Sequence, residues 1–222
     1  MLNIVKYQNS QNLISPLGFR KDWWFWKNNI KLNVKKIISF LLKEETKILK
    51  KYKSSGDGNV NLPNSVTARH ASFNLFTIKD NKNLFEVKKF IKKNIKDCIL
   101  QYNIDYKEVY IKCWFNVLRK GEEIKPHVHD EIDTAEMSFL AGNLFIEGED
   151  TYTFYQTPFS NQVIKIKNIP GDLILFPPYI KHWTNINKSK KPRLSIAFDI
   201  QPSKEFCSPI YLKNKSIVKI KL

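Results

Sequence analysis

Three of the four histidines of this 222-residue chain lie in its second half, at a spacing that suits metal binding. His127 and His129 occur in the run PHVHD, and His182 follows in PPYIKHW. Side chains at positions i and i+2 of an extended segment project from the same face, so His127 and His129 can converge on one ion. A third imidazole from a distant strand would complete one face of an octahedron, leaving the other positions for a bidentate co-substrate and dioxygen. The pattern predicts an oxygen-activating metal centre.

A candidate anchor for a co-substrate follows the third histidine. Arg193 and Ser195 stand two residues apart in the run PRLSIAFDI, so both side chains lie on one face of an extended strand. A guanidinium fork beside a hydroxyl suits the carboxylate at the far end of a dicarboxylic acid. Turn residues at Gly121 and at 170–171 precede the first and last histidine segments, as expected if each segment begins after a turn.

The elements that must position these residues change in character near residue 105. Before it, apolar residues recur at helical spacing from Val34 for about five turns, and again from Leu84 to about Tyr102. After it, short alternating or β-branched runs lie between Gly, Pro and Asn, which indicates a sandwich or a barrel. The predicted strands are 108–118, 137–147, 151–156, 162–167, 172–177, 193–200 and 216–221.

We therefore expect one domain over residues 1–222, because a chain of this length can bury a complete core. Residues 1–104 are expected to be a mainly helical supporting part, and residues 105–222 the β core. Residues 1–31 show no regular pattern, and the aromatic run WWFW at 23–26 is expected to cover the core. The lysines of the second helix are expected to form a solvated face.

Composition limits the class of protein. No run approaches the roughly 20 apolar residues of a membrane helix, and the first residues lack a secretory pattern, so we expect no membrane contact. Cys98, Cys113 and Cys207 have no close pairing and indicate the reduced thiols of a cytoplasmic protein. The formal net charge of +16 suits nucleic acid, but lysine is spread along the whole chain and arginine is rare. Nucleic acid is therefore not the favoured partner.

The order of these motifs resembles a known family, the 2-oxoglutarate–Fe(II) oxygenases found in bacteria and phages, over about residues 110–200. The similar runs are WFNV (114–117), HVH (127–129), AGNLFI (141–146), PGDLILFPP (170–178), KHW (181–183) and RLSIAFD (193–199). The resemblance implies an α+β fold, in which a double-stranded β-helix (jelly-roll, cupin-like) carries an amino-terminal helical layer. It also implies Fe(II), 2-oxoglutarate and O2, and a dioxygenase that hydroxylates an unidentified substrate with succinate and CO2 as co-products. By position, His127 and His182 match iron ligands, and Arg193, with Ser195 beside it, matches the 2-oxoglutarate anchor.

The chain departs from that family at the second ligand. The common pattern there is His-x-Asp or His-x-Glu, whereas this chain has His129. Either the site has three histidines, or Asp130 or Glu131 supplies the carboxylate instead. The i+2 spacing favours His129.

A second departure concerns the co-substrate. Phe145 stands at a strand position where a polar aromatic residue would help to bind 2-oxoglutarate. Asn116 and Asn143 are the expected substitutes. The fourth histidine, His70, is expected to be a structural residue bonded to the backbone, with a substrate contact by His70 or Arg69 as the less favoured role.

The main alternative is a metal-binding cupin without oxygenase activity, such as an isomerase or a sensor. The paired histidines and His182 fit a cupin pattern equally well. A cupin usually has a glutamate a few residues after the pair, whereas Glu136 lies too far along the chain, and Arg193 would have no role. Formation of succinate from 2-oxoglutarate would distinguish the two functions.

Overall fold

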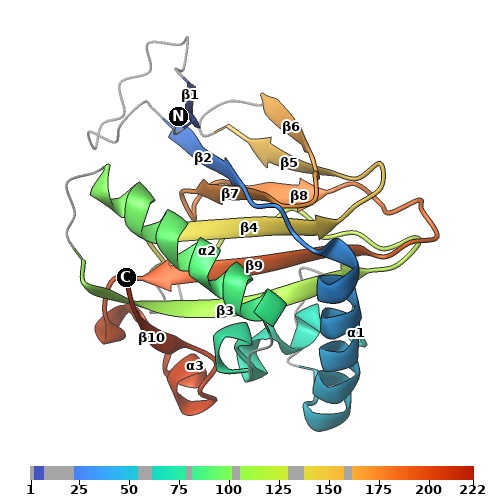
Figure 1. Cartoon of the computed structure of the whole chain (residues 1–222), viewed down its shortest axis with the longest axis horizontal. Helices are drawn as coiled ribbons and strands as arrows, with labels where there is room; N and C mark the ends of the chain where they lie inside the picture. Colours follow the sequence, from blue (N-terminus) through green and yellow to red (C-terminus); the bar gives the residue numbers. More distant parts are fainter. Residues whose placement is uncertain are drawn as a thin grey trace.

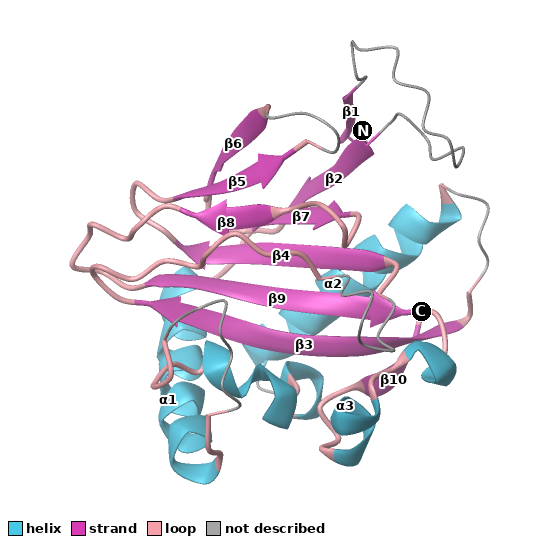
Figure 2. Ribbon diagram, turned by 180° about the vertical axis from the view of Figure 1, so that it is seen from behind, coloured by secondary structure: helices cyan, strands magenta, loops and turns pink. Residues whose placement is uncertain are grey.

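Two antiparallel sheets face each other in the computed structural model, and helices cover the outer face of the larger sheet (Figures 1 and 2). The structure describes residues 3–7, 23–54, 62–78, 82–101, 106–129, 138–157 and 162–222. The architecture is the expected α+β fold, a double-stranded β-helix with a helical layer. No helix in the described part of the chain is long and apolar enough to cross a membrane.

The larger sheet has the strand order β1-β2-β7-β4-β9-β3-β10, and the smaller sheet has the order β6-β5-β8. The strands are β1 (Asn3–Tyr7), β2 (Trp23–Asn29), β3 (Glu108–Leu118), β4 (Leu140–Glu147), β5 (Tyr152–Gln156), β6 (Val163–Lys167), β7 (Asp172–Phe176), β8 (His182–Thr184), β9 (Arg193–Gln201) and β10 (Val218–Lys221). Every strand predicted from the sequence is present, because alternating or β-branched runs between turn residues mark these segments clearly.

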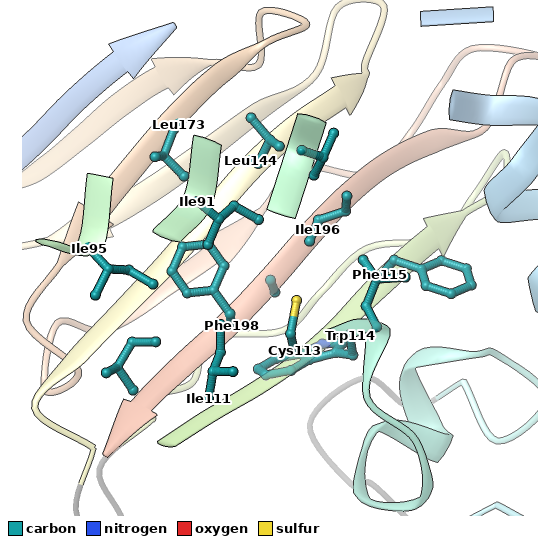
Figure 3. Packing of buried hydrophobic residues seen from close by; sticks show 14 of the residues in the cluster. Ile91, Ile95, Ile111, Cys113, Trp114, Phe115, Leu144, Leu173, Ile196 and Phe198 are labelled. Carbon is teal, nitrogen blue, oxygen red and sulfur yellow. The ribbon is translucent and has the colours of Figure 1, made fainter. Parts of the chain in front are cut away.

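Both predicted helices form and lie on one face of the larger sheet. Their bounds are Val34–Lys51 (α1) and Lys82–Leu100 (α2); the shorter helices are η1 (Thr67–Ser72), η2 (Leu75–Thr77), η3 (Lys204–Phe206) and α3 (Pro209–Lys213). Ile91 and Ile95 of α2 point toward Ile196 and Phe198 of β9 (Figure 3). One hydrophobic cluster thus joins both halves of the chain, which supports our proposal of a single domain over residues 1–222.

The structure corrects the expectation that residues 1–31 are irregular. Residues 23–29 form β2, which pairs with β7, and β1 pairs with β2. Phe25 lies between the two sheets, whereas Trp26 lies on the opposite face and donates its Nε1 hydrogen to Oδ1 of Asn94 at 3.1 Å. Both of these side chains are buried, and the run WWFWKNN neither alternates nor contains β-branched residues, so it does not show the pattern of a strand.

One lysine of α2 also departs from the expected solvated face. Lys88 is buried and donates to the backbone carbonyl oxygens of Phe76 and Ile78 at 3.1 and 3.0 Å. It ties the helix to the segment at the end of η2, a tertiary role that helical periodicity does not reveal.

Strand β9 has one apolar face and one polar face, and the polar face contributes residues to the candidate site. All nine of its residues are buried, yet its two faces differ in chemistry. Leu194, Ile196, Phe198 and Ile200 belong to the cluster beneath the helices, whereas Arg193, Ser195 and Asp199 lie at alternating positions and face the space between the sheets.

Candidate metal and co-substrate site

The histidines predicted as metal ligands come together at the smaller sheet. The extended segment that contains His127 and His129 pairs with β8, since the backbone N–H and C=O groups of His127 and His182 bond to each other at 3.1 and 2.9 Å. The N–H of His129 donates to the carbonyl of Pro178 at 2.9 Å. One ring nitrogen of each histidine lies within 4.8 Å of the other two. Among the described residues, these three side chains form the group that could hold a metal ion.

Each of the three imidazoles has an acceptor at its Nδ1 atom. Nδ1 of His127 lies 2.8 Å from the carbonyl oxygen of Lys125, and Nδ1 of His182 lies 3.0 Å from that of Ile180. Nδ1 of His129 contacts a carboxylate oxygen of Asp199. Carbonyl oxygens and carboxylates only accept, so the protons of the neutral rings belong on Nδ1.

The Nε2 atoms therefore carry no proton, and their lone pairs face one another. Nε2 of His127 and Nε2 of His129 are 3.2 Å apart. Two nitrogens bound at right angles to one metal ion at about 2.1 Å would lie roughly 3 Å apart. The donor set thus fits a divalent transition-metal ion such as Fe(II), for which imidazole is a common ligand.

Burial keeps two of these histidines neutral. It lowers the pKa of His127 to about 4, and the charge of His129 contributes in the same direction. The pKa of His182 is held well below its usual range, first by burial and then by the charges of His127 and His129. Both rings can therefore offer a lone pair at neutral pH without competing protons.

Asp199 was not identified from the sequence. It is 3% exposed on the inner face of β9, and its carboxylate accepts the Nδ1 hydrogen of His129. Burial alone would raise the pKa of Asp199, but the charge and hydrogen bond of His129, together with the charge of Lys112, lower it. Asp199 lies an even number of residues after Arg193 and Ser195, so strand alternation could have placed it on the same face as these two residues. The alternative carboxylates, Asp130 and Glu131, lie outside the described residues.

Arg193, the predicted co-substrate anchor, is enclosed between the two sheets. Its Nη2 donates to Oγ1 of Thr153 at 3.0 Å, and the amide of Asn168, in the orientation that satisfies its neighbours, accepts from Nε at 3.0 Å. Its Nη1 is buried and has no hydrogen-bond partner among the described residues. Burial lowers the pKa of Arg193 to about 10, so the group remains a cation at neutral pH. It is therefore a buried cation with one free donor.

Tyr155 is a polar aromatic residue beside the histidines that was not identified from the sequence. Its ring stacks on that of His182 with centroids 5.7 Å apart. Its hydroxyl is buried without a hydrogen-bond partner in the described part of the chain, as Nη1 of Arg193 is. Burial raises the pKa of Tyr155 despite the charge of Arg193, so the hydroxyl keeps its proton. Tyr155 therefore lies beside His182, on the face of β5 that also carries Thr153, the partner of Arg193.

The remaining predicted site residues have different surroundings. Asn116 accepts from Oγ1 of Thr67 at 2.9 Å and donates to Oγ of Ser195 at 3.3 Å, so its amide is already engaged in orienting that serine. The Oδ1 atom of Asn143 is buried and has no partner among the described residues. Phe145 belongs to the apolar cluster between the sheets.

His70 and Arg69 have structural contacts. Nδ1 of His70 lies 3.0 Å from the carbonyl oxygen of Thr67, as expected for a histidine bonded to the backbone. Arg69 donates to carbonyl oxygens of the residues at 52, 63 and 65. These bonds tie η1 to the end of α1 and to the segment that precedes η1.

Known proteins resemble this chain in both sequence and fold. Residues 112–199 match the family described as "Putative 2OG-Fe(II) oxygenase". No curated protein matches the chain by sequence.

Solved structures share the fold. A Pseudomonas putida prolyl-4-hydroxylase is 8% identical, with a TM-score of 0.54 over 80% of this chain and 91% of that one. A viral collagen prolyl hydroxylase from Paramecium Bursaria Chlorella virus-1 is 17% identical, with a TM-score of 0.51 over 80% and 95%. The non-heme alpha ketoglutarate dependent carbocyclase SnoK, from nogalamycin biosynthesis, is 11% identical, with a TM-score of 0.51 over 80% and 79%. Over residues 112–199, the chain thus matches the 2-oxoglutarate–Fe(II) oxygenases, a family whose members use Fe(II), 2-oxoglutarate and O2.

Proposed function

We propose that this protein is a 2-oxoglutarate-dependent dioxygenase that hydroxylates an unidentified substrate, with succinate and CO2 as co-products. His127, His129 and His182 hold Fe(II) in this proposal. The observation that carries it is the convergence of three imidazoles, each with an acceptor at Nδ1, beside a buried guanidinium that has a free donor. A histidine group that served only to stabilise the fold would not need its Nε2 lone pairs to face one another.

Arg193 and Tyr155 bind the distal carboxylate of 2-oxoglutarate in this proposal. Among the described residues, Nη1 of Arg193 and the hydroxyl of Tyr155 are buried without a hydrogen-bond partner, which is unfavourable for both groups in the free protein. One carboxylate can accept from Nη1 of Arg193 and from the Tyr155 hydroxyl, which satisfies both groups at once. Thr153 and Asn168 hold the guanidinium in place for that contact, and Ser195 offers a further hydroxyl on the same strand face.

The protein contributes orientation and a water-poor environment. When bound, Fe(II) and 2-oxoglutarate supply the oxidising power that activates O2. Phe145, Phe176 and Ile180 form part of the apolar cluster between the sheets, and the ring of Phe176 lies 4.8 Å from that of His182. Phe176 therefore helps to shield His182, the most buried of the three histidines, from water. The hydrogen bonds at Nδ1 fix the three rings so that each directs Nε2 toward the same point.

The test measures Fe(II) stoichiometry together with succinate released from 2-oxoglutarate. Wild type is expected to bind one Fe(II) and to release succinate. His127→Ala, His129→Ala and His182→Ala are each expected to lose stoichiometric iron, because two remaining ligands do not complete the site. His70→Ala is the matched histidine control and should keep its iron.

A further variant separates the two arrangements at the second ligand. Asp130→Asn should leave iron and succinate release nearly unchanged if His129 is the ligand. Loss of iron in Asp130→Asn with retention in His129→Ala would assign the ligand to the carboxylate. Full iron binding by His182→Ala would refute the site, and iron binding without succinate formation would point to a cupin.

A further inference from the structure

The contact between His129 and Asp199 distinguishes one candidate ligand from the other two. His127 and His182 direct their Nδ1 hydrogens at neutral backbone carbonyls, those of Lys125 and Ile180. His129 directs its own at the carboxylate of Asp199. The charged partner thus lies behind the histidine that occupies the position where the related oxygenases commonly have a carboxylate ligand.

The surroundings of Asp199 show that this carboxylate is held in place. Its side chain is 5% exposed, and an uncompensated charge at that depth would cost several kcal/mol. Lys112 stands opposite Asp199 in the register of β3 and β9, and it is itself buried, with Nζ 3.7 Å from the ring centroid of Tyr211. Positive charge from Lys112 and the ring N–H of His129 stabilise the carboxylate where it can act on the imidazole.

We propose that Asp199 is a positioning residue. It acts through its hydrogen bond to His129, and so supplies beside the metal site the negative charge that a carboxylate ligand at position 129 would supply directly. By accepting the Nδ1 hydrogen, Asp199 fixes the tautomer and the ring orientation of His129 and increases the donor strength of Nε2. The negative charge also partly offsets the additional positive charge that a site with three neutral ligands would carry. This inference rests on the proposed function, because it requires His129 to be a metal ligand.

A purely structural role for Asp199, as the partner of Lys112, predicts a different outcome. In that case, removing the carboxylate would weaken the fold and would affect any metal site nearby to the same degree, whatever residue stood at position 129. If Asp199 acts through the imidazole, its effect must disappear when the imidazole is replaced. A double-mutant cycle measures that difference directly.

The experiment measures Fe(II) affinity under anaerobic conditions, by chelator competition, in four proteins: wild type, Asp199→Asn, His129→Asp and the double variant. Asp199→Asn is expected to weaken Fe(II) binding by about 10- to 100-fold in wild type, as for other partners of metal-bound histidines. In the His129→Asp background, the same change should weaken binding by less than about threefold, since aspartate has no ring N–H for Asp199 to accept.

The matched control is Asp172→Asn. Asp172 is a buried aspartate of β7 whose partners are Lys27 and Asn29, so its removal should leave Fe(II) affinity unchanged. Equal losses of affinity from Asp199→Asn in the two backgrounds, or no loss in wild type, would overturn the inference. Absence of Fe(II) binding by wild type would instead refute the proposed function.

A second measurement does not depend on the His129→Asp variant. The Zn(II)-loaded protein should show, by proton–nitrogen NMR, three ring Nδ1–H signals, with that of His129 furthest downfield because its acceptor is a carboxylate. Asp199→Asn should move or remove this signal alone and leave those of His127 and His182 in place. An unchanged His129 signal would contradict the proposal, even if the variant bound metal more weakly.

Discussion

The two faces of β9 are equally buried and have opposite chemistry. The outer face carries Leu194, Ile196, Phe198 and Ile200 against the helices, where shape and apolar area stabilise the fold. The inner face carries Arg193, Ser195 and Asp199, whose burial is unfavourable unless each polar group finds a partner.

The inner face also differs in whether each of its polar groups has a hydrogen-bond partner within the fold. The carboxylate of Asp199 accepts from His129, and Oγ of Ser195 accepts from Asn116, so the acceptors of both residues have partners. Arg193 keeps one donor without a partner among the described residues. The outer face therefore contributes mainly to the stability of the fold, and the inner face contributes mainly to ligand binding. Substitutions on the two faces should separate stability from binding.

The largest change in stability is expected on the outer face. Phe198→Ala should lower the free energy of unfolding by about 3–5 kcal/mol, because it removes a fully buried ring and leaves a cavity. The ring packs over Gly142, which has no side chain to fill the space that the substitution would leave. Urea unfolding checks the loss of stability. Fe(II) affinity of the folded fraction should stay at the wild-type value, and a loss comparable to that of His182→Ala would break the distinction between the faces.

A smaller change, in binding, is expected from the inner face. Arg193→Ala should weaken 2-oxoglutarate by about 100-fold, since a charge-assisted contact to a carboxylate contributes roughly 2–3 kcal/mol. Iron should remain bound, because Arg193 contacts none of the histidines through a hydrogen bond in the described structure. Calorimetric titration of the metal-loaded protein with 2-oxoglutarate measures the effect. Unchanged affinity would remove the anchor role.

Tyr155→Phe sharpens the comparison because it deletes one atom. The hydroxyl has no partner in the described part of the protein, so its removal should leave the free energy of unfolding unchanged or slightly raise it. Binding of 2-oxoglutarate should weaken by about tenfold, the effect of roughly one neutral hydrogen bond. Thermal unfolding and the same calorimetric titration give both values. A stability loss with unchanged binding would place Tyr155 with the outer-face residues.

A pH dependence of the metal-free protein tests the burial of two histidines. The pKa values of His127 and His70 are lowered to about 4 and about 3, in each case mainly by burial, whereas an unfolded histidine titrates near 6.5. The unfolded chain therefore binds more protons below pH 6.5. Stability should fall as the pH drops from about 6.5 toward 4, by up to about 1.4 kcal/mol per pH unit for each such histidine.

Urea unfolding at several pH values measures this slope. His70→Gln removes one of the shifted groups and should reduce the slope without affecting the iron ligands. An unaltered slope in that variant would show that His70 is not held neutral by the fold.

The sequence by itself determined the β core, the two long helices and the three histidines with Arg193. These features depend on short-range patterns: alternation along strands, helical periodicity, and an i, i+2 pair of ligands. The departure at position 129 was also visible in the sequence, because the usual carboxylate is replaced there by an imidazole. Residues 23–29 escaped prediction because the run WWFWKNN neither alternates nor contains the β-branched residues that mark the other buried strands.

Only the tertiary structure decided what completes the site. Asp199 meets His129 across 70 positions of sequence, and Tyr155 reaches the region of Arg193 from the opposite sheet. Strand periodicity places Asp199 and Arg193 on one face of β9, but it does not say which side chains from another sheet that face will meet. Such pairings depend on how the two sheets stack and on the register of β8 beside the segment at 127–129, and distant contacts of this kind leave no local signature in the sequence.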